Sequence, residues 1–425
     1  MGFWTGNTPR MLSLYTVKGD SVVVPYGCLK EVSKLTGTAK WTPEFKEKQT
    51  VDYGDAFVPL FDYQKEAVKE LISAYYGILQ SPAGSGKTQM GIALAVMSKH
   101  RTLWLTHTKD LLTQSLSRAQ EYIDPAKLGT ITEGKVHIGE CMTFATIQTM
   151  SKLDLTLYKD EWDLIIVDEC HRVAGTPTAV TQFSKVLNGL RARHKYGLSA
   201  TVHRADGLIK ATYSLLGPIV YQVSTEEVAD RVMKVDVVPV GTGIGMSRTY
   251  LNSDGTINYI KMINFLAGCE ERNEIISDDL VINKDHYNLI LSERVEHLET
   301  LYQSLPPYLQ KQASVIHGKM TSKAAKAERE RAIEDMRNGD KRYLFATYQL
   351  AKEGLDIPRL DRLYLATPQK DYAVITQSVG RVARVYAGKG QPIVYDYVDS
   401  TRGLLKAYKR RCTTYRKLGC RIREE

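Results

Sequence analysis

The residues best suited to chemistry lie in a loop of small side chains at positions 81–88, Ser-Pro-Ala-Gly-Ser-Gly-Lys-Thr, directly after the apolar run 77–80. Small side chains let backbone N–H groups approach a phosphate, Lys87 reaches the outer phosphates, and the Thr88 hydroxyl is a ligand for Mg²⁺. The strict phosphate-loop pattern begins with glycine, where this chain has Ser81. A purely structural glycine turn is the alternative, but the preceding strand and the helix expected over 89–97 favour phosphate binding.

A second polar cluster, Asp168-Glu-Cys-His171, follows the apolar strand expected over 163–167. Ligands of α/β proteins collect at the carboxyl ends of parallel strands. We therefore expect Asp168 to hold Mg²⁺ and Glu169 to orient or deprotonate an attacking water. Adjacent carboxylates at a strand end are often only solvated. Downstream of a phosphate loop, nucleotide hydrolysis is the favoured interpretation.

A third cluster, Gln377-Ser-Val-Gly-Arg-Val-Ala-Arg384, has helical spacing. Gln377, Gly380, Arg381 and Arg384 are expected to share one helical face. Guanidinium groups stabilise the charge that develops on a transferred γ-phosphate. A surface helix with ordinary salt bridges is the alternative, and the two earlier clusters favour the catalytic interpretation.

The elements that must position these clusters alternate between short apolar runs and helix-like stretches, which is typical of parallel sheets with helices on both faces. Two such sets predict two α/β lobes. A helix capped by Thr321 is expected over 323–337, ending at Asn338-Gly339. The strands expected are 77–80, 102–106, 163–167, 196–199, 288–291, 313–316, 343–346, 362–366 and 393–397.

The two ends of the chain differ from the lobes. Residues 11–17 and 21–24 around a Lys18-Gly19-Asp20 turn predict a hairpin, followed by a helix from Cys28. The tail predicts a helix with Leu404, Leu405, Tyr408, Cys412, Tyr415 and Leu418 on one stripe and basic residues opposite. A second hairpin is expected over 250–259, with a strand-separating pin and mere decoration as its two interpretations. The domains expected are an accessory module (1–45), lobe 1 (46–225), lobe 2 (226–400) and a basic helix (401–425).

Composition narrows the class of protein. The formal net charge is +9, and residues 401–425 hold nine Lys and Arg against two Glu, which suits a polyanionic partner. Six scattered cysteines without a C-x-x-C pair indicate neither a disulfide framework nor a zinc site. No apolar run is long enough for a membrane helix, and the first 30 residues lack a signal-peptide pattern. A cytoplasmic protein, in the host cytoplasm if phage-encoded, is expected.

Five motifs in one order carry a resemblance to a known family. Gly84–Thr88, Asp168–His171, Ser199–Thr201, Glu353–Asp356 and Gln377–Arg384 together resemble a superfamily 2 DExH-type helicase over roughly residues 58–400. The stretch 199–207 is most similar to the DNA-remodelling branch that includes XPB, RecG and phage UvsW. The resemblance implies two RecA-like lobes, and within that branch a bacteriophage branch-migration helicase is the expected type.

The resemblance also implies roles for single residues. Gln64 corresponds to a glutamine that reads adenine, Thr201 to a threonine that links nucleotide state to strand grip, and Asp356 to a loop near the nucleotide sugar and phosphate. The cofactors implied are ATP and Mg²⁺, the latter on Thr88 and Asp168. The catalytic residues implied are Lys87, Asp168, Glu169, His171, Gln377, Arg381 and Arg384. The ATP-binding residues implied are Gln64, Gly84, Ser85, Gly86, Lys87, Thr88, Gly354 and Asp356. The residues implied to bind nucleic acid are Thr106, Thr146, Gln148, Thr201 and Thr347.

An ATP-dependent DNA helicase or translocase acting on forked or branched DNA through its phosphate backbone is the expected function, with no membrane and with unknown protein partners. An RNA helicase is the nearest alternative. The Asp-Glu-Cys-His box, the stretch Thr106-His-Thr-Lys109 and Gln377 differ from the usual RNA-helicase residues. A non-unwinding, ATP-gated clamp on branched DNA and a restriction-system motor subunit are further alternatives.

Overall fold

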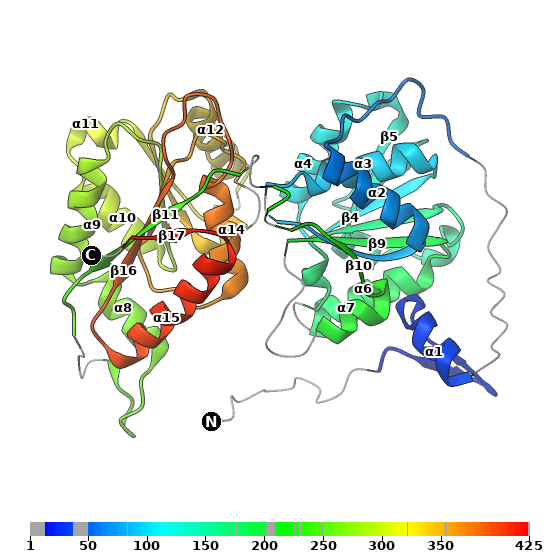
Figure 1. Cartoon of the computed structure of the whole chain (residues 1–425), viewed down its shortest axis with the longest axis horizontal. Helices are drawn as coiled ribbons and strands as arrows, with labels where there is room; N and C mark the ends of the chain where they lie inside the picture. The colour runs from blue at the N-terminus through cyan, green and yellow to red at the C-terminus, as the bar shows by residue number, and fades with distance from the viewer. Residues whose placement is uncertain are drawn as a thin grey trace. The chain divides into compact units, whose positions relative to one another are not determined.

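The chain forms two compact units, residues 1–227 and 228–425. We describe each unit by itself from a computed structural model (Figure 1). The structure describes residues 13–36, 50–82, 84–174, 177–200, 209–224, 226–228, 232–245, 247, 250–320, 322–352 and 355–423. No helix in these ranges is both long enough and apolar enough to cross a membrane.

Unit 1 is built on an eight-stranded sheet in the order β10-β3-β9-β8-β4-β7-β5-β6. All neighbours pair in parallel except β5 and β6, which are antiparallel. The central strands are buried along their whole length, as expected for a parallel sheet covered on both faces. The strands are β3 (Tyr76–Gln80), β4 (Thr102–Thr106), β5 (Leu128–Thr132), β6 (Lys135–His137), β7 (Met142–Thr146), β8 (Leu164–Asp168), β9 (His194–Ser199) and β10 (Ile219–Gln222).

Two layers of helices cover this sheet. The helices α2 (Asp62–Ala74), α3 (Lys87–Ser98) and α4 (Lys109–Gln120) pack side by side in one layer. The other layer holds α5 (Ile147–Met150), α6 (Pro177–Gly189) and α7 (Ile209–Leu216). Short 3₁₀ turns complete the unit: η2 (Pro125–Lys127), η3 (Leu155–Leu157) and η4 (Cys170–Ala174).

The amino-terminal module consists of β1 (Thr16–Lys18), β2 (Ser21–Val23), η1 (Tyr26–Cys28) and α1 (Leu29–Thr36). The strands β1 and β2 form the expected hairpin. Gly27 docks the module on α7, because a Cβ at this position would lie 2.3 Å from Tyr213 O. The Tyr26 ring packs edge-on against Tyr76, at 5.0 Å between centroids. The described part of the module therefore lies where β3 begins, at the opposite end of that strand from the phosphate loop.

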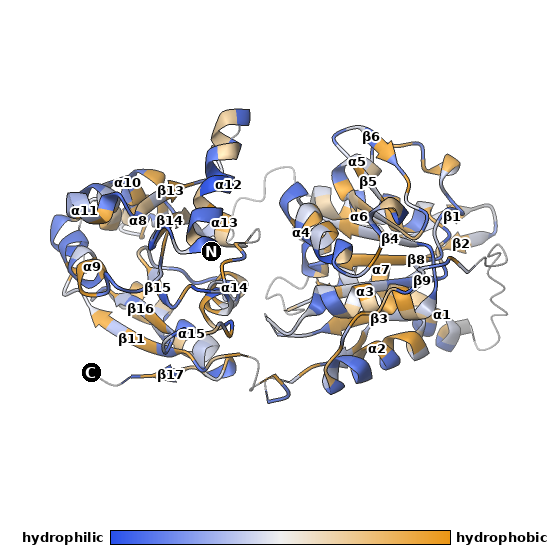
Figure 2. Ribbon diagram, turned by 90° about the horizontal axis from the view of Figure 1, so that it is seen from above, coloured by the Kyte–Doolittle hydropathy of each residue, from blue (hydrophilic) through white to orange (hydrophobic). Residues whose placement is uncertain are grey.

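Unit 2 has a seven-stranded, all-parallel sheet in the order β13-β14-β12-β15-β16-β11-β17. In Figure 2 the strands of both sheets include the most hydrophobic segments. The strands are β11 (Asp236–Gly241), β12 (Asn288–Ser292), β13 (Ala313–Ile316), β14 (Tyr343–Thr347), β15 (Arg362–Leu365), β16 (Ile393–Val398) and β17 (Arg421–Ile422). The helices are α8 (Tyr259–Ala267), α9 (Glu270–Ile282), α10 (Val295–Ser304), α11 (Pro307–Gln310), α12 (Lys323–Asn338), α13 (Tyr348–Lys352), α14 (Tyr372–Val382) and α15 (Arg402–Lys417).

The two-lobe α/β prediction is confirmed, and every predicted strand of the lobes exists within two residues of its predicted ends. The predicted helix of lobe 2 ends as expected at Gly339, whose φ of 92° suits glycine. Ser322 caps its start, where its hydroxyl accepts from Ala325 N, and Thr321 lies outside the described residues. The predicted hairpin near 250 is a single bridge, Leu251 to Ile257, rather than a pair of long strands.

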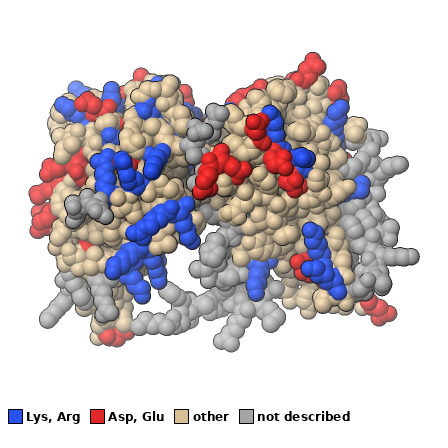
Figure 3. Space-filling model, in the orientation of Figure 1, with Lys and Arg blue, Asp and Glu red and all other residues tan. Residues whose placement is uncertain are grey.

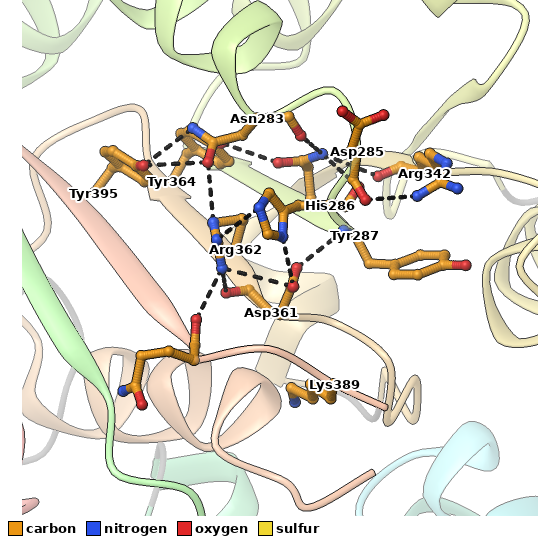
Figure 4. A network of polar contacts seen from close by, with 12 residues as sticks. Asn283, Asp285, His286, Tyr287, Arg342, Asp361, Arg362, Tyr364, Lys389 and Tyr395 are labelled. Carbon is orange, nitrogen blue, oxygen red and sulfur yellow. Dashed lines mark hydrogen bonds and ion pairs between the residues drawn. The ribbon is translucent and has the colours of Figure 1, made fainter. Parts of the chain in front are cut away.

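A buried polar network connects the amino-terminal ends of strands in the unit 2 sheet (Figure 4). The Arg362 guanidinium donates to Asn283 Oδ1 at 3.0 Å and to Gln391 O at 2.9 Å, and it lies 3.6 Å from Asp361 Oδ2. His286 bridges the pair, with Nδ1 2.8 Å from Asp361 Oδ2 and Nε2 2.8 Å from Arg362. The charges are thus paired and hydrogen-bonded, which burial of a charge requires.

We predict that Arg362→Ala lowers the free energy of unfolding of the chain by about 3–5 kcal/mol, because it leaves the Asp361 carboxylate buried without its partner. Urea denaturation followed by circular dichroism measures the change. Arg331→Ala, at an exposed position of α12, is the control and should stay within about 0.5 kcal/mol of the parent. Equal effects of the two substitutions would contradict the assignment of this network as a stabilising one.

Candidate nucleotide-hydrolysis site

The loop between β3 and α3 has a backbone that only glycine adopts without strain. Gly84 and Gly86 have φ angles of 86° and 79°. A Cβ on Gly86 would lie 2.5 Å from Gln64 Nε2. Gly86 is also the N-cap of α3, so backbone N–H groups at the start of that helix face the loop. This geometry suits an anion such as a phosphate.

Ser81, which breaks the strict phosphate-loop pattern, is fully buried and closes the loop from inside. Its hydroxyl donates to Ser85 Oγ, and Ser85 Oγ donates to Pro82 O at 2.7 Å. Its backbone N–H donates to Ser199 O at 3.0 Å and joins the loop to the end of β9. Lys87 Nζ lies over the same turn, 3.2 Å from Ser81 O. The serine therefore takes a structural part in the loop.

Gln64 lies against the loop, buried at 1% exposure. Its Nε2 donates to Ser85 O at 2.9 Å, and its Oε1 accepts from Phe61 N at 3.0 Å. Tyr63 donates its hydroxyl hydrogen to the same Ser85 carbonyl at 2.9 Å. The sequence pattern did not single out Tyr63, because a tyrosine on a helix gives no signal for this contact. The predicted adenine-reading glutamine is thus a brace of the phosphate loop in this structure, and its contact with adenine stays a prediction.

The carboxylate pair lies at the carboxyl end of β8. Asp168, at 6% exposure, accepts from Glu169 N at 2.9 Å and from Ser115 Oγ at 3.4 Å. Burial raises the pKa of the Asp168 carboxyl to about 7; the Glu169 charge adds to this rise and the Lys87 charge opposes it. Glu169 has φ 48°, a left-handed conformation that is strained for a residue with a side chain and is typical of functional sites. Ser115 is a further site residue for which the sequence gave no motif signal.

A magnesium ion fits this donor set. The Asp168 carboxyl is buried beside Glu169, which raises its pKa, and a nearby divalent cation would favour the charged form. Thr88 is half-buried in the first turn of α3 and supplies a hydroxyl oxygen. Within the described residues, no group of three or more His, Cys, Asp and Glu side chains offers a separate metal site.

His171 connects the carboxylate box to the end of β9. Its Nδ1 lies 3.0 Å from Ser199 Oγ and 3.3 Å from Glu169 Oε2. Ser199 precedes Thr201, which lies outside the described residues. The His171 imidazole therefore contacts both Glu169 and the last residue of β9.

Cys170, which replaces the alanine of the common box, packs against a glycine of β9. A Cβ on Gly197 would lie 2.7 Å from Cys170 Sγ and 2.9 Å from Cys170 Cβ. Real Cβ atoms essentially never approach a neighbour so closely. The larger side chain at 170 is therefore compatible with the sheet because position 197 has none.

Three of the residues predicted to contact nucleic acid lie together at the carboxyl ends of strands in unit 1. Thr106 and Thr146 are paired residues of β4 and β7. Gln148, half-buried, donates to His107 O at 2.8 Å. Thr106 is completely buried, and its hydroxyl donates to Thr108 O at 3.0 Å. In this structure the Thr106 side chain braces the loop, which corrects the expectation that its hydroxyl itself faces a strand.

The arginine motif lies on and after α14 in unit 2. Gln377 is buried, and Arg381 Nε donates to Ala351 O at 3.1 Å. The helix ends at Val382, because Arg384 forms an antiparallel bridge with Val232. The expectation that Arg384 shares a helical face with Gln377 and Arg381 is therefore wrong. Its guanidinium instead forms an ion pair with Asp356, which the resemblance placed near the nucleotide. Thr347 ends β14, and Gly354 lies outside the described residues.

Comparison with protein families agrees with this geometry. Residues 57–204 match the model of the type III restriction enzyme res subunit, and residues 271–386 match the helicase conserved C-terminal domain. The first match spans the phosphate loop and the carboxylate box, and the second spans α14. Each match lies within one unit.

Individual relatives are distant. A protein of Acanthamoeba polyphaga mimivirus named as an ATP-dependent RNA helicase is 27% identical over 80% of this chain and 63% of its own length. The DNA 3'-5' translocase XPB2 of Sulfurisphaera tokodaii is 25% identical over 78% of this chain and 79% of its own length. The ATP-dependent DNA helicase UvsW of Enterobacteria phage T4 is 21% identical over 89% and 80%. Among solved structures, Saccharomyces cerevisiae Dbp5 has the same fold, with a TM-score of 0.60, 17% identity and coverage of 85% of this chain and 88% of Dbp5.

The fold and the matches define a two-lobe protein with RecA-like α/β units. The two family matches correspond to the two domains of superfamily 2 helicases, the class of nucleic-acid-dependent ATPases, and the chain is similar to the XPB and UvsW members of that class. The chain spans 63% of the length of its mimivirus relative.

We predict that Gly197→Ala lowers the free energy of unfolding by about 1–3 kcal/mol, because the new methyl group overpacks against Cys170. Adding Cys170→Ala should recover part of this loss, so the two effects should not be additive. Urea titration of the two single variants and the double variant measures the coupling. Gly268→Ala is the control, since its Cβ would meet only Asn264 O at 3.5 Å and Phe265 O at 3.9 Å. Strict additivity would show that Cys170 is not the obstacle.

Proposed function

We propose that this chain is an ATP-dependent DNA helicase or translocase that unwinds or remodels duplex and branched DNA, including forks and junctions. The observation that supports it most is the meeting of the phosphate loop, Asp168 and Glu169 at one edge of the unit 1 sheet. The Lys87 ammonium charge interacts with the Asp168 carboxyl and partly opposes the rise in its pKa that burial causes. An intact loop and an intact carboxylate pair favour an active ATPase over a passive clamp.

In the proposed reaction, Gly84, Ser85 and Gly86 with the α3 N-terminus hold the phosphates through backbone N–H groups, and Lys87 neutralises the outer phosphates. Thr88 and Asp168 would hold Mg²⁺, which would polarise the phosphate oxygens. Glu169 orients the attacking water and accepts its proton.

We further propose that Arg381 and Arg384 stabilise the charge on the γ-phosphate, with Gln377 in the same motif. Arginines in this role contribute a factor of about 10³–10⁵ in rate. His171 relays the state of the Glu169 site to Ser199 and the segment after β9. Thr146, Gln148, Thr201 and Thr347 then contact the nucleic-acid backbone, which carries no sequence information.

The choice of DNA over RNA rests on the sequence of the motifs and on relatives named as DNA helicases or translocases, XPB2 and UvsW. The similar mimivirus protein is named as an RNA helicase, so an RNA helicase is the second candidate. Comparing ATP hydrolysis with matched DNA and RNA oligonucleotides distinguishes the two, and stimulation by RNA alone would overturn the DNA assignment.

We predict that Lys87→Ala abolishes DNA-stimulated ATP hydrolysis, with a loss of at least about 100-fold, while DNA binding stays within about threefold. The loss follows from removing the charge that neutralises the outer phosphates. A coupled phosphate-release assay and fluorescence anisotropy measure the two properties. Lys99→Ala, beyond the end of α3, is the control and should turn over ATP normally. Unchanged hydrolysis in the Lys87 variant would exclude this loop as the ATP site.

We predict that Glu169→Gln binds ATP as the parent does but unwinds neither forks nor four-way junctions, because an amide cannot accept the proton of the water. A panel of fork, junction and blunt duplex substrates with ATP measures strand displacement. If the parent protein binds branched DNA with ATP but displaces no strand from any substrate, the clamp interpretation replaces the motor.

A further inference from the structure

The carboxy-terminal helix α15 is held rigidly on unit 2 by a buried charged contact. Arg411 forms two hydrogen bonds with Asp396, Nε to Oδ2 at 2.8 Å and a terminal nitrogen to Oδ1 at 2.7 Å. Tyr415 donates to Asp396 Oδ2 at 2.7 Å, and Arg411 also donates to Gln369 O at 3.0 Å. Arg411 is 3% exposed and Tyr415 is fully buried. These contacts fix the rotation of α15 about its axis.

Both ends of α15 are also fixed. Thr401 caps the first turn with its hydroxyl, which accepts from Leu404 N at 3.4 Å. After the helix, β17 joins the edge of the sheet beside β11. The guanidinium of Arg421 binds both carboxylate oxygens of Asp236, at 2.9 and 2.6 Å. These contacts leave one face of α15 turned away from the sheet of unit 2.

That outward face carries a row of five exposed basic residues, which we call the α15 stripe: Lys406, Lys409, Arg410, Arg416 and Lys417. Their spacing of i, i+3, i+4, i+10 and i+11 places them on one side of a helix, over about 16 Å of axis. None of the five forms an ion pair with a carboxylate of the described residues. The Lys417 ammonium, at the end of the stripe, lies 5.9 Å from the centroid of the Tyr372 ring on α14. Figure 3 shows Lys and Arg side chains gathered over this part of unit 2.

The helix α12 is also rich in Lys and Arg, but unlike α15 it contains acidic residues. On α12, Arg337 is paired with Glu334, and Glu328 and Glu330 stand among the remaining basic residues. On α15 no acidic residue occurs between 402 and 417. Like charges three and four residues apart destabilise a helix by about 0.2–0.5 kcal/mol per pair. Repulsion among the stripe residues therefore lowers the stability of α15, and its packing on unit 2 offsets this loss. Such a uniformly basic surface is expected where a polyanion binds.

We propose that the α15 stripe is a second nucleic-acid contact, outside the helicase motifs, that binds the phosphate backbone of a duplex. Duplex DNA carries about one negative charge per 1.7 Å of axis, so a rigid row of cations meets several phosphates at once. Single strands are usually held by exposed aromatic side chains that stack on bases. The two tyrosines of α15 are not exposed: Tyr415 is buried, and Tyr408 is half-buried with the Arg411 guanidinium over its ring. This inference rests on the proposed function, because it assumes that the motor works beside a duplex.

Neutralising three stripe residues in the full chain tests the proposal. In Lys406→Gln/Lys409→Gln/Arg416→Gln, the slope of log affinity against log salt for a blunt 40-base-pair duplex should fall by about 2–3, close to 0.9 per lost phosphate contact. Affinity at low salt should drop at least about tenfold, and the curves of variant and parent should converge at high salt. The charge-preserving variant Lys406→Arg/Lys409→Arg/Arg416→Lys should keep the slope of the parent.

The matched control is Lys65→Gln/Lys69→Gln/Arg118→Gln, which changes the net charge equally at exposed helical residues. Each of these residues already has a carboxylate three residues away, Asp62, Glu66 or Glu121. Its salt slope should match that of the parent. Equal slopes of log affinity against log salt for the stripe variant and the control would overturn the proposal. A stripe variant that keeps duplex binding but loses binding to anionic phospholipid vesicles would also overturn it. Thermal unfolding by circular dichroism confirms that both variants fold.

Hydrolysis of ATP separates this inference from the proposed function. A short single strand at saturating concentration should stimulate the stripe variant as it does the parent, since no stripe residue belongs to the ATP site. If no nucleic acid stimulates ATP hydrolysis by the parent, the proposed motor function is excluded. The second contact is still supported in that case if the salt dependence of duplex binding changes in the stripe variant. If stimulation is normal and the slope does not depend on the stripe, only the second contact fails.

Discussion

The parallel register of β3, β9 and β8 is the constraint on which the site depends. Gln80 lies opposite Ser199, and Asp168 lies opposite Leu198, so the three strands end at nearly the same level. The phosphate loop, the carboxylate box and Ser199 therefore emerge side by side, although some 120 residues separate the first from the last. Both faces of β8 and β9 are buried, so packing against the helices on the two faces helps to hold this register and, with it, the positions of the groups at the strand ends.

In unit 2 the corresponding constraint is charge. Four buried carboxylates, Asp236, Asp361, Asp396 and Asp399, each pair with an arginine. For Asp236 and Asp396 that arginine comes from the last 25 residues of the chain. Burying such pairs costs desolvation free energy that well-packed apolar residues would avoid. The pairs are directional, however, and they define where α15 and β17 attach. An apolar contact alone would leave the helix freer to rotate and would not hold its basic face in one direction.

Much of the fold was predictable because apolar runs such as 102–106 and 313–316 end sharply in polar turns. The strands β5, β7 and β11 were not predicted, since their sequences mix apolar residues with Gly, Thr or Pro. The strands β6, β10 and β17 were not predicted either, because each has only two to four residues and lies at the edge of its sheet. Leu405 is 40% exposed although its spacing placed it on the apolar stripe of the tail, because the Arg411–Asp396 contact sets the rotation of α15. Likewise, helical spacing placed Arg384 on α14, and only the structure shows its bridge to Val232.

The departures from the family pattern share one physical explanation. Ser81 stands where the pattern has glycine, and its hydroxyl bonds to Ser85 within the loop. Cys170 stands where the pattern has alanine, and it fills the space left by Gly197 on the adjoining strand. In both cases a neighbour accommodates the change: Ser85 bonds to the Ser81 hydroxyl, and Gly197 leaves room for the Cys170 thiol. Both departures are therefore explained by contacts inside unit 1, and neither replaces Lys87, Asp168 or Glu169, the residues proposed for hydrolysis.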